Sequence, residues 1–177
     1  FAASDEEITQ WEIEPGPNVP SMNSWSLPIE DVQGLTVLGK VIYMAEDGTD
    51  KIFVAAIPDP VFTISKTPKG MTSDGTDLYL VIDADPKDMV AKVSQAGVLI
   101  DSFIPPADNI GAIALVNGSL YLGGEERNEC PPFCEGMEPG AKLYKTDTDG
   151  QLLASYFLSF SGASAGNITG LTNDGSE

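Results

Sequence analysis

Residues 70–80 read GMTSDGTDLYL, and the same order of residue types returns at three other places in the chain. A small residue opens a short apolar run, a turn containing Gly follows, and a second apolar run carries an aromatic residue. This order is typical of a β-hairpin. The related stretches read GLTVLGKVIYM at 34–44, AIALVNGSLYL at 112–122 and GLTNDGSE at 170–177. The chain therefore repeats one hairpin, and we expect an architecture of repeated units.

Each of the three hairpins that begin at residues 34, 70 and 112 is followed by two more short apolar runs, so each of these units holds four predicted strands. In the first unit these strands read QGLTVL, VIYMAE, KIFVAAI and VFTIS. A period of about 40 residues with four strands per unit is typical of propeller blades, because each sheet has to bury both faces against its neighbours. We therefore predict an all-β fold with little helix, a β-propeller of four-stranded antiparallel blades. The tyrosines of the hairpins, Tyr43, Tyr79 and Tyr121, are expected to pack between blades.

The chain holds about four blade equivalents, which form one β-propeller domain or part of one. The extra length of the third full unit falls between its second and third strands. We expect a partial blade at 1–29, blades at 30–66 and 67–106, a blade with a cysteine-containing insertion at 107–165, and the first strand of a split blade at 166–177.

The strands predicted at the two ends of the chain would together make up most of one blade. The C-terminal segment predicts a first strand, whereas residues 1–13 predict a second and a third strand without a first. Three interpretations stay open: a four-bladed ring closed by its own termini, half of a larger ring completed by a second copy, or a piece of a longer chain. Unpaired strand edges would favour association in the last two cases.

The composition excludes several functions. The chain has 177 residues, 27 acidic and 9 basic side chains, no His and a formal charge of −18. Nucleic acid is not an expected partner, since binding a polyphosphate relies on Lys and Arg. Catalysis by a Ser-His-Asp or Cys-His arrangement needs a histidine that the sequence lacks. The sequence contains no run of 18 apolar residues, so it predicts no transmembrane segment. Cations or a basic protein surface are the partners that such a charge attracts.

The repeated pattern resembles the NHL, YVTN and gluconolactonase-like β-propellers. The resemblance lies in the motif small-x-[ST]-x-x-G-x-x-[LI]-Y, followed by a strand with Lys and by turns such as 95–97 and 149–151. It implies the propeller fold, but such propellers include lactonases, phosphatases and pure binding scaffolds. A lactonase-like function would place Glu, Asn and Asp at the mouths of the inner strands, around a divalent metal. The candidates at those mouths are Glu30, Asp31, Asp108, Asn109 and Asn167.

In propellers of this kind, the loops between second and third strands share a face with the entries of the first strands. Here those loops carry 14 of the 27 carboxylates, so we predict a strongly negative face. Carboxylate oxygens suit Ca²⁺, whereas Asp and Gly are also the ordinary residues of tight turns. The predicted metal ligands are Asp47, Asp50, Asp83, Asp85 and Asp88.

Two cysteines and two sequons bear on the compartment. Cys130 and Cys134 lie four apart in a turn-rich loop, and we predict a local disulfide between them, which indicates an oxidising compartment. Asn117 and Asn167 each begin an Asn-x-Ser/Thr sequon, a candidate glycosylation site in a secreted eukaryotic chain. Asn117 and Gly118 are also ordinary hairpin-turn residues. We expect an extracellular or periplasmic protein.

These features predict a secreted or cell-surface β-propeller that acts as a binding and structural scaffold through its acidic loop face. Its partner would be a protein or a second copy of the chain that joins it through the split terminal blade. No cofactor is expected apart from Ca²⁺. The alternative is a metal-dependent lactonase or esterase-like hydrolase with its site at the central channel.

Overall fold

The computed structural model describes residues 2–4, 7–11, 22–26, 29, 31–55, 57–107, 109–126, 140–158 and 168–171. Every element in these ranges is a β-strand, and none is a helix. The strands are β1 (Ala2–Ser4), β2 (Glu7–Trp11), β3 (Met22–Ser26), β4 (Val32–Leu38), β5 (Val41–Glu46), β6 (Lys51–Val54), β7 (Phe62–Thr63), β8 (Pro68–Ser73), β9 (Leu78–Ile82), β10 (Met89–Val93), β11 (Leu99–Phe103), β12 (Ile110–Val116), β13 (Ser119–Glu126), β14 (Gly140–Thr146) and β15 (Leu152–Leu158).

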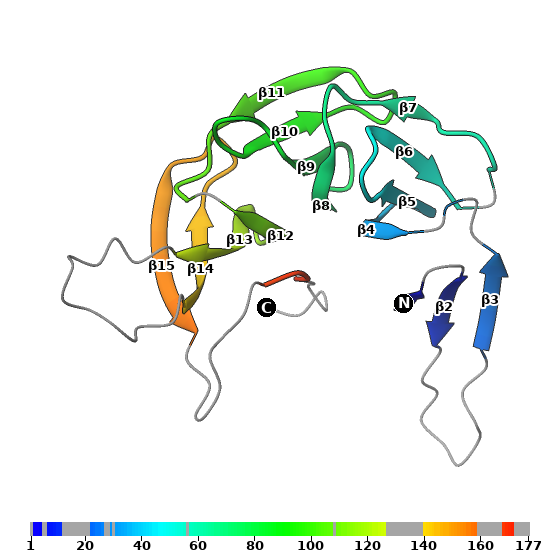
Figure 1. Ribbon diagram of the computed structural model, residues 1–177, viewed down its shortest axis with the longest axis horizontal. Coiled ribbons are helices and arrows are strands. Elements are labelled where there is room, and N and C mark those ends of the chain that lie inside the picture. The colour runs from blue at the N-terminus through cyan, green and yellow to red at the C-terminus, as the bar shows by residue number, and fades with distance from the viewer. Residues whose placement is uncertain are drawn as a thin grey trace, which may run out of the picture.

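The strands form one three-stranded and three four-stranded antiparallel sheets, with the orders β1-β2-β3, β4-β5-β6-β7, β8-β9-β10-β11 and β12-β13-β14-β15. The four-stranded sheets, here called the first, second and third blades, follow one another around an arc. Their first strands lie nearest its centre and their last strands lie on its outside (Figure 1). This arrangement confirms the predicted all-β, propeller-like architecture.

The inner strands pack backbone against backbone because small residues occupy their closest approach. A Cβ atom on Gly34 would lie 3.2 Å from the Cα of Gly70, and one on Gly70 would lie 3.5 Å from the Cα of Ala112. Two inter-blade hydrogen bonds add to this contact: Ser73 Oγ donates to the Val37 carbonyl, and the Leu115 N–H donates to Thr72 Oγ1. The small residues that open the repeated hairpins are therefore what allows the inner strands to meet.

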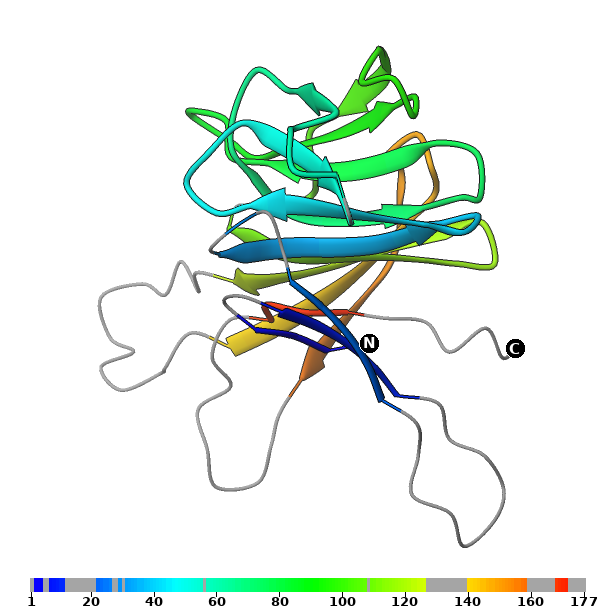
Figure 2. The same ribbon diagram turned by 90° about the vertical axis from the view of Figure 1, so that its right-hand side faces the viewer.

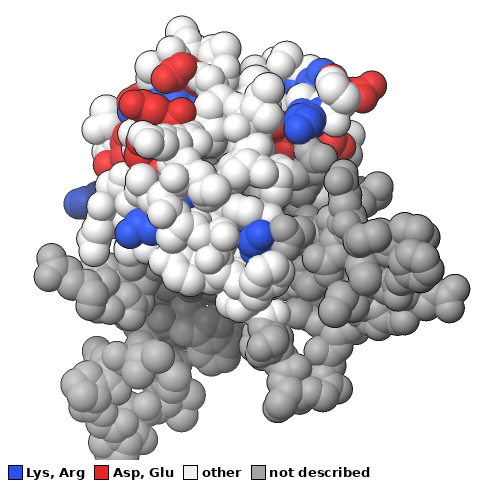
Figure 3. All heavy atoms as spheres, turned by 90° about the vertical axis from the view of Figure 1, so that its left-hand side faces the viewer, with Lys and Arg blue, Asp and Glu red and all other residues white. Residues whose placement is uncertain are grey.

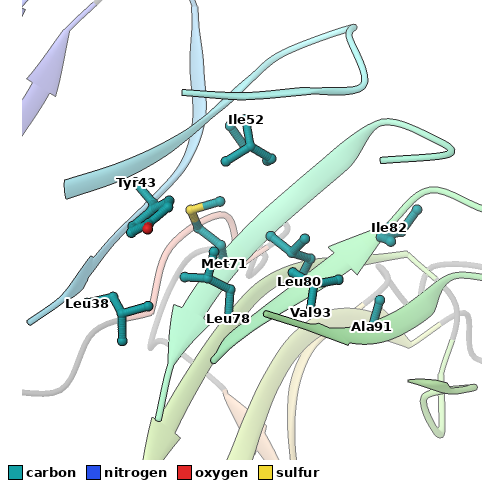
Figure 4. Packing of buried hydrophobic residues seen from close by; sticks show 10 residues of the cluster. Leu38, Tyr43, Ile52, Met71, Leu78, Leu80, Ile82, Ala91 and Val93 are labelled. Atoms are coloured by element: carbon teal, nitrogen blue, oxygen red, sulfur yellow. The ribbon is translucent and has the colours of Figure 1, made fainter. Parts of the chain in front are cut away.

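The hydrophobic core lies between blades, in separate layers. Between the first and second blades, Tyr43 and Ile52 pack against Leu78, Leu80 and other buried side chains (Figure 4). Between the second and third blades, Tyr79 packs among buried side chains of both sheets. The expectation that the repeated tyrosines fill inter-blade layers is confirmed for Tyr43 and Tyr79.

The β1–β3 sheet and residues 168–171 lie on the open side of the arc. Figures 1 and 2 place the sheet at the end next to β4 and residues 168–171 at the end next to β12. The sheet lacks an inner strand, and residues 168–171 form no hydrogen-bonded pair with any strand that the structure describes. The split blade predicted from the two ends of the chain stays a prediction, because residues 168–171 are assigned to no strand.

Candidate functional site

One face of the arc carries the connection β5–β6 at 47–50, the connection β9–β10 at 83–88 and the entries of the inner strands; we call it the loop face. Both connections are fastened in the same way. The Asp47 N–H donates to the Asp31 carbonyl at 3.0 Å, and the Asp83 N–H donates to the Thr67 carbonyl at 2.9 Å. Each bond lies within its own blade, and the two bonds join equivalent pairs of residues. The two connections therefore start from the same geometry.

The five aspartates predicted as metal ligands occupy two different environments. Asp47, Asp50, Asp83 and Asp85 have exposed side chains on the loop face. Asp88 is 4% exposed and lies between blades. Within the described ranges, no group of three or more His, Cys, Asp or Glu side chains is placed to hold a metal ion. The structure thus does not gather the five aspartates, and Ca²⁺ binding on this face stays a prediction.

Asp88 has protein partners for both of its carboxylate oxygens. Lys69 Nζ lies 2.8 Å from one oxygen, and the backbone N–H of Ile110 donates to the other at 2.7 Å. Lys69 comes from β8 of the same blade, whereas Ile110 begins β12 of the next blade. Asn109 precedes it with a φ of 56°, a left-handed conformation that Asn tolerates better than most residues. The local turn at Asn109 and the carboxylate of Asp88 therefore fasten the second blade to the third.

Lys69 is held by two carboxylates on the loop face. Its Nζ lies 2.8 Å from Asp88 and 3.3 Å from Asp83. Partial burial by itself lowers the pKa of Lys69, but the hydrogen bonds and charges of Asp88 and Asp83 outweigh it and raise the pKa above its usual value. The lysine therefore stays cationic and neutralises part of this acidic face.

Strand register explains why the equivalent aspartate of the first blade lacks the backbone partner that Asp88 has. Asp50 occupies in the first blade the position of Asp88 in the second, as the pairing of their sheets shows. The position of Ile110, however, is taken in the second blade by Pro68, which has no N–H to donate. Asp50 is accordingly exposed.

A cavity of about 80 Å³ lies where the inner strands converge with residues 168–171. Its lining consists mostly of glycine and apolar residues, with the side chains of Gln33 and Thr169 as the polar exceptions. Among the residues predicted for a hydrolase, Asn109 is exposed and does not line this cavity. Glu30, Asp108 and Asn167 lie outside the described residues. No observation on the described residues favours the lactonase or esterase alternative, which stays a prediction.

Of the residues predicted to be glycosylated or disulfide-bonded, the structure describes Asn117 alone. Asn117 is exposed in the two-residue turn between β12 and β13, with a φ of 48°. Glycosylation of Asn117 stays a prediction. Asn167, Cys130 and Cys134 lie outside the described residues, so the second sequon and the disulfide also stay predictions.

Sequence reasoning did not find Lys69. This lysine lies at an inner-strand mouth, where the equivalent residues of the neighbouring blades are Gln33 and Gly111. A single cation at the mouth position of one repeat was the available signal. The reciprocal signal, an aspartate directly before the third strand of the same repeat, was read as a metal ligand.

Comparison with known proteins supports the fold. A chain in a crystal structure of a nidogen–laminin complex matches with a TM-score of 0.64 and 18% identity over 98% of this chain. This chain spans 65% of the length of that one. An N11 neuraminidase-like protein of A/flat-faced bat/Peru (H18N11) matches with a TM-score of 0.41 and 12% identity, covering 92% of this chain and 47% of that one. No protein-family model and no curated protein matches the sequence.

The nidogen–laminin match shows the β-propeller fold, and at 18% identity it shows the fold alone. Membership of the NHL, YVTN or gluconolactonase-like group stays a prediction, because no family model matches. The part of the chain that the structure describes contains no helix that is long and apolar enough to span a membrane.

Proposed function

We propose that this protein is an extracellular or periplasmic β-propeller scaffold whose loop face binds a basic protein surface. The proposal includes assembly of copies through the split blade. The observation that carries it is the arrangement of exposed carboxylates on two equivalent, fastened connections of successive blades. Asp47 and Asp50 lie on one connection, and Asp83 and Asp85 lie on the other.

The repeated backbone bonds support binding by a preorganised surface. A loop that already has its bound conformation loses little entropy when the partner arrives. The carboxylates add long-range attraction, which raises the association rate and selects partners of opposite charge. Asp88 serves a different purpose, since its charge faces Lys69 and the Ile110 N–H rather than solvent.

The comparison supports a protein partner as well. The similar structure holds nidogen and laminin in a complex, so a propeller of this shape occurs in an assembly of proteins. The charge of −18 on this chain favours a partner that is basic.

Binding of a Lys/Arg-rich peptide, followed by fluorescence anisotropy at low salt, tests the loop face. The variant Asp47→Asn/Asp50→Asn/Asp85→Asn removes three exposed charges from this face without touching the Lys69 pair. Asp59→Asn/Asp101→Asn/Asp149→Asn is the matched control, because it removes the same charge from exposed sites on other connections and on β11. We expect the first variant to weaken binding about three- to tenfold, and the control to change it little.

Equal weakening by both triple variants would show that net charge alone attracts the peptide, and would overturn a site on the loop face. Repeating the titration with Ca²⁺ separates the two uses of the carboxylates. Calcium that competes with the peptide at the same aspartates would place a cation site there, whereas an unchanged titration would leave the peptide as the ligand.

A further inference from the structure

Each blade presents the same four positions to the blade that follows it. The pairing of the strands aligns Ile52 and Phe62 of the first blade with Val90 and Phe103 of the second, and with Leu143 and Tyr156 of the third. On the second strands, Tyr43 and Ala45 align with Tyr79 and Val81, and with Tyr121 and Gly123. An aromatic residue therefore stands on the outer strand of all three blades, at one position and toward one side.

In the first two blades this outer aromatic packs on a glycine of the next blade. A Cβ atom on Gly97, in the turn between β10 and β11, would lie 2.6 Å from the ring of Phe62. A Cβ atom on Gly150, in the turn between β14 and β15, would lie 2.3 Å from the ring of Phe103. The contact thus recurs at both joints between full blades, where a ring fills the space that a side chain would otherwise occupy.

The third blade has the same aromatic, Tyr156, but none of the glycines that the structure describes lies against its ring. Tyr156 is 47% exposed, whereas Phe62 and Phe103 are half-buried. Leu143 is also partly exposed, although its equivalents Ile52 and Val90 are completely buried. We call the four positions Tyr121, Gly123, Leu143 and Tyr156 the open face. Because the same positions are covered by a blade at the other two joints, the occupant that fits the open face is another blade.

The inner part of the open face is already covered by residues 168–171. Ile168 packs on Gly123, at a position equivalent to that of Ile110, which packs in the layer with Val81. These residues therefore lie where the first strand of a following blade belongs. Thr169 and Gly170 are exposed, and no backbone hydrogen bond joins them to another described residue. Their backbone is therefore open to pairing with an incoming strand.

The β1–β3 sheet has an open edge that could accept such an inner strand. This sheet has three strands in antiparallel order, and β1 pairs on one side with β2 while its other edge is free of described strands. The sheet of the same chain lies at the other end of the arc, next to β4 (Figures 1 and 2). Residues 168–171 and the β1–β3 sheet thus lie on the open side of the arc and form no described pair with each other within one copy.

We propose that the open face is an assembly surface that takes the β1–β3 sheet of a second copy of this chain. Residues 168–171 of one copy supply the inner strand, β1 of the other pairs with it, and Tyr156 packs on the incoming sheet. This joint rests on the assembly part of the proposed function and is independent of the acidic loop face. It completes one mixed blade by strand addition, and two such joints close a pair of copies.

Native mass in solution tests the joint, measured by light scattering over a range of concentrations in a reducing buffer, so that cysteine cross-links do not contribute. The expected mass is twice the 18.7 kDa of one chain or a larger multiple. Tyr156→Glu should weaken association at least about tenfold, because it places a charge where the joint would bury an aromatic ring. Phe157→Glu is the matched control: this aromatic neighbour is 66% exposed, lies next to Lys142 and faces the opposite side of the same strand.

A second variant addresses the strand itself. Thr169→Pro removes a backbone N–H and fixes φ within the segment that would pair with β1, while Thr169→Ala keeps the N–H. Circular dichroism and urea titration establish that each variant is folded. Dissociation by Tyr156→Glu and Thr169→Pro, with Phe157→Glu and Thr169→Ala still associated, is the expected result. A wild-type chain that is monomeric at every concentration, or association that all four variants leave equal, would overturn the proposal.

These results are separable from the test of the loop face. If the variants dissociate the protein while peptide binding is retained, the joint stands by itself. If peptide binding fails but association still depends on Tyr156 and Thr169, the loop-face proposal falls and the joint remains.

Discussion

The carboxylate of Asp88 accepts a 2.7 Å hydrogen bond from the backbone N–H of Ile110, and this bond joins the second blade to the third. The other oxygen of the same carboxylate pairs with Lys69 at 2.8 Å. One buried charge is thereby satisfied by a neighbouring strand and by a cation at the start of the inner strand β8. The bond shows how an aspartate of a surface connection can belong to the core rather than to a ligand site.

Removing this carboxylate should destabilise the fold. Asp88→Ala leaves the buried Ile110 N–H without its acceptor and Lys69 without its nearer partner, at a cost of about 2–3 kcal/mol. Asp88→Asn keeps an acceptor oxygen and should cost less. Urea unfolding measures both, with Asp85→Asn as the control on an exposed aspartate of the same connection. A control that loses as much stability as Asp88→Ala would contradict this role for Asp88.

A substitution at Thr146 should stabilise the fold. Its side chain is fully buried, and its hydroxyl has no hydrogen-bond partner among the described residues. The equivalent residue of the second blade is Val93, which is also buried. Thr146→Val should therefore raise the free energy of unfolding by up to about 1 kcal/mol, because it removes an unsatisfied polar group. Thr63→Val, on an exposed strand position, should change it little; a loss of stability in Thr146→Val would argue for a partner of this hydroxyl.

The glycines under the outer aromatics should be more sensitive than other turn glycines. Gly118 and Gly150 both have positive φ, but a Cβ atom meets nothing within 4 Å at Gly118 and meets the Phe103 ring at Gly150. Gly118→Ala carries the backbone strain alone, about 1–2 kcal/mol. Gly150→Ala adds displacement of the ring and should cost clearly more in urea unfolding. Equal losses in the two variants would mean that Phe103 moves aside freely.

Acid should weaken the cluster around Asp74 at the opposite end of the second blade. Burial alone would raise the pKa of Asp74, but hydrogen bonds from the Asp77 and Thr76 N–H groups and from Lys92 lower it below its usual 3.8. The contribution of this group to stability is therefore complete above pH 3.8, and it is lost as the pH falls through the lower folded-state pKa.

Asp74→Asn should accordingly flatten the decline of unfolding free energy on the acid side of pH 3.8, although the variant starts from a lower stability at neutral pH. Urea titrations at several pH values measure this slope. Asp59→Asn is the control on an exposed aspartate of another connection. Parallel curves for Asp74→Asn and the wild type would show that Asp74 makes no contribution to acid sensitivity.

The repeated hairpin was sufficient to predict the fold. Tyr43 and Tyr79 lie in successive inter-blade layers, as their recurrence with a small residue and a turn glycine indicated. Such signals are local, because a hairpin needs its turn residues and its alternating apolar residues within about a dozen positions. The outer aromatics Phe62 and Phe103 follow the same period, but each of them packs on a glycine of the next blade. Spacing within one repeat could not show that contact.

The site was predicted less well than the fold, for a related reason. Asp50 and Asp88 precede the third strand of their blades in the same way, yet Asp50 is exposed and Asp88 is buried. The difference comes from the following blade, where Ile110 offers an N–H and Pro68 does not. A count of carboxylates on loops therefore overestimates the number available to a ligand.

By itself, the sequence determined the strand content, the repeat and the high negative charge. These properties depend on residues that are near one another in the chain or on simple sums over it. Only the tertiary structure decided which carboxylate is buried, that Lys69 faces Asp83 and Asp88, and that the outer aromatic Tyr156 is exposed. Each of these facts depends on a neighbouring blade, and packing between blades brings together residues that no local pattern connects.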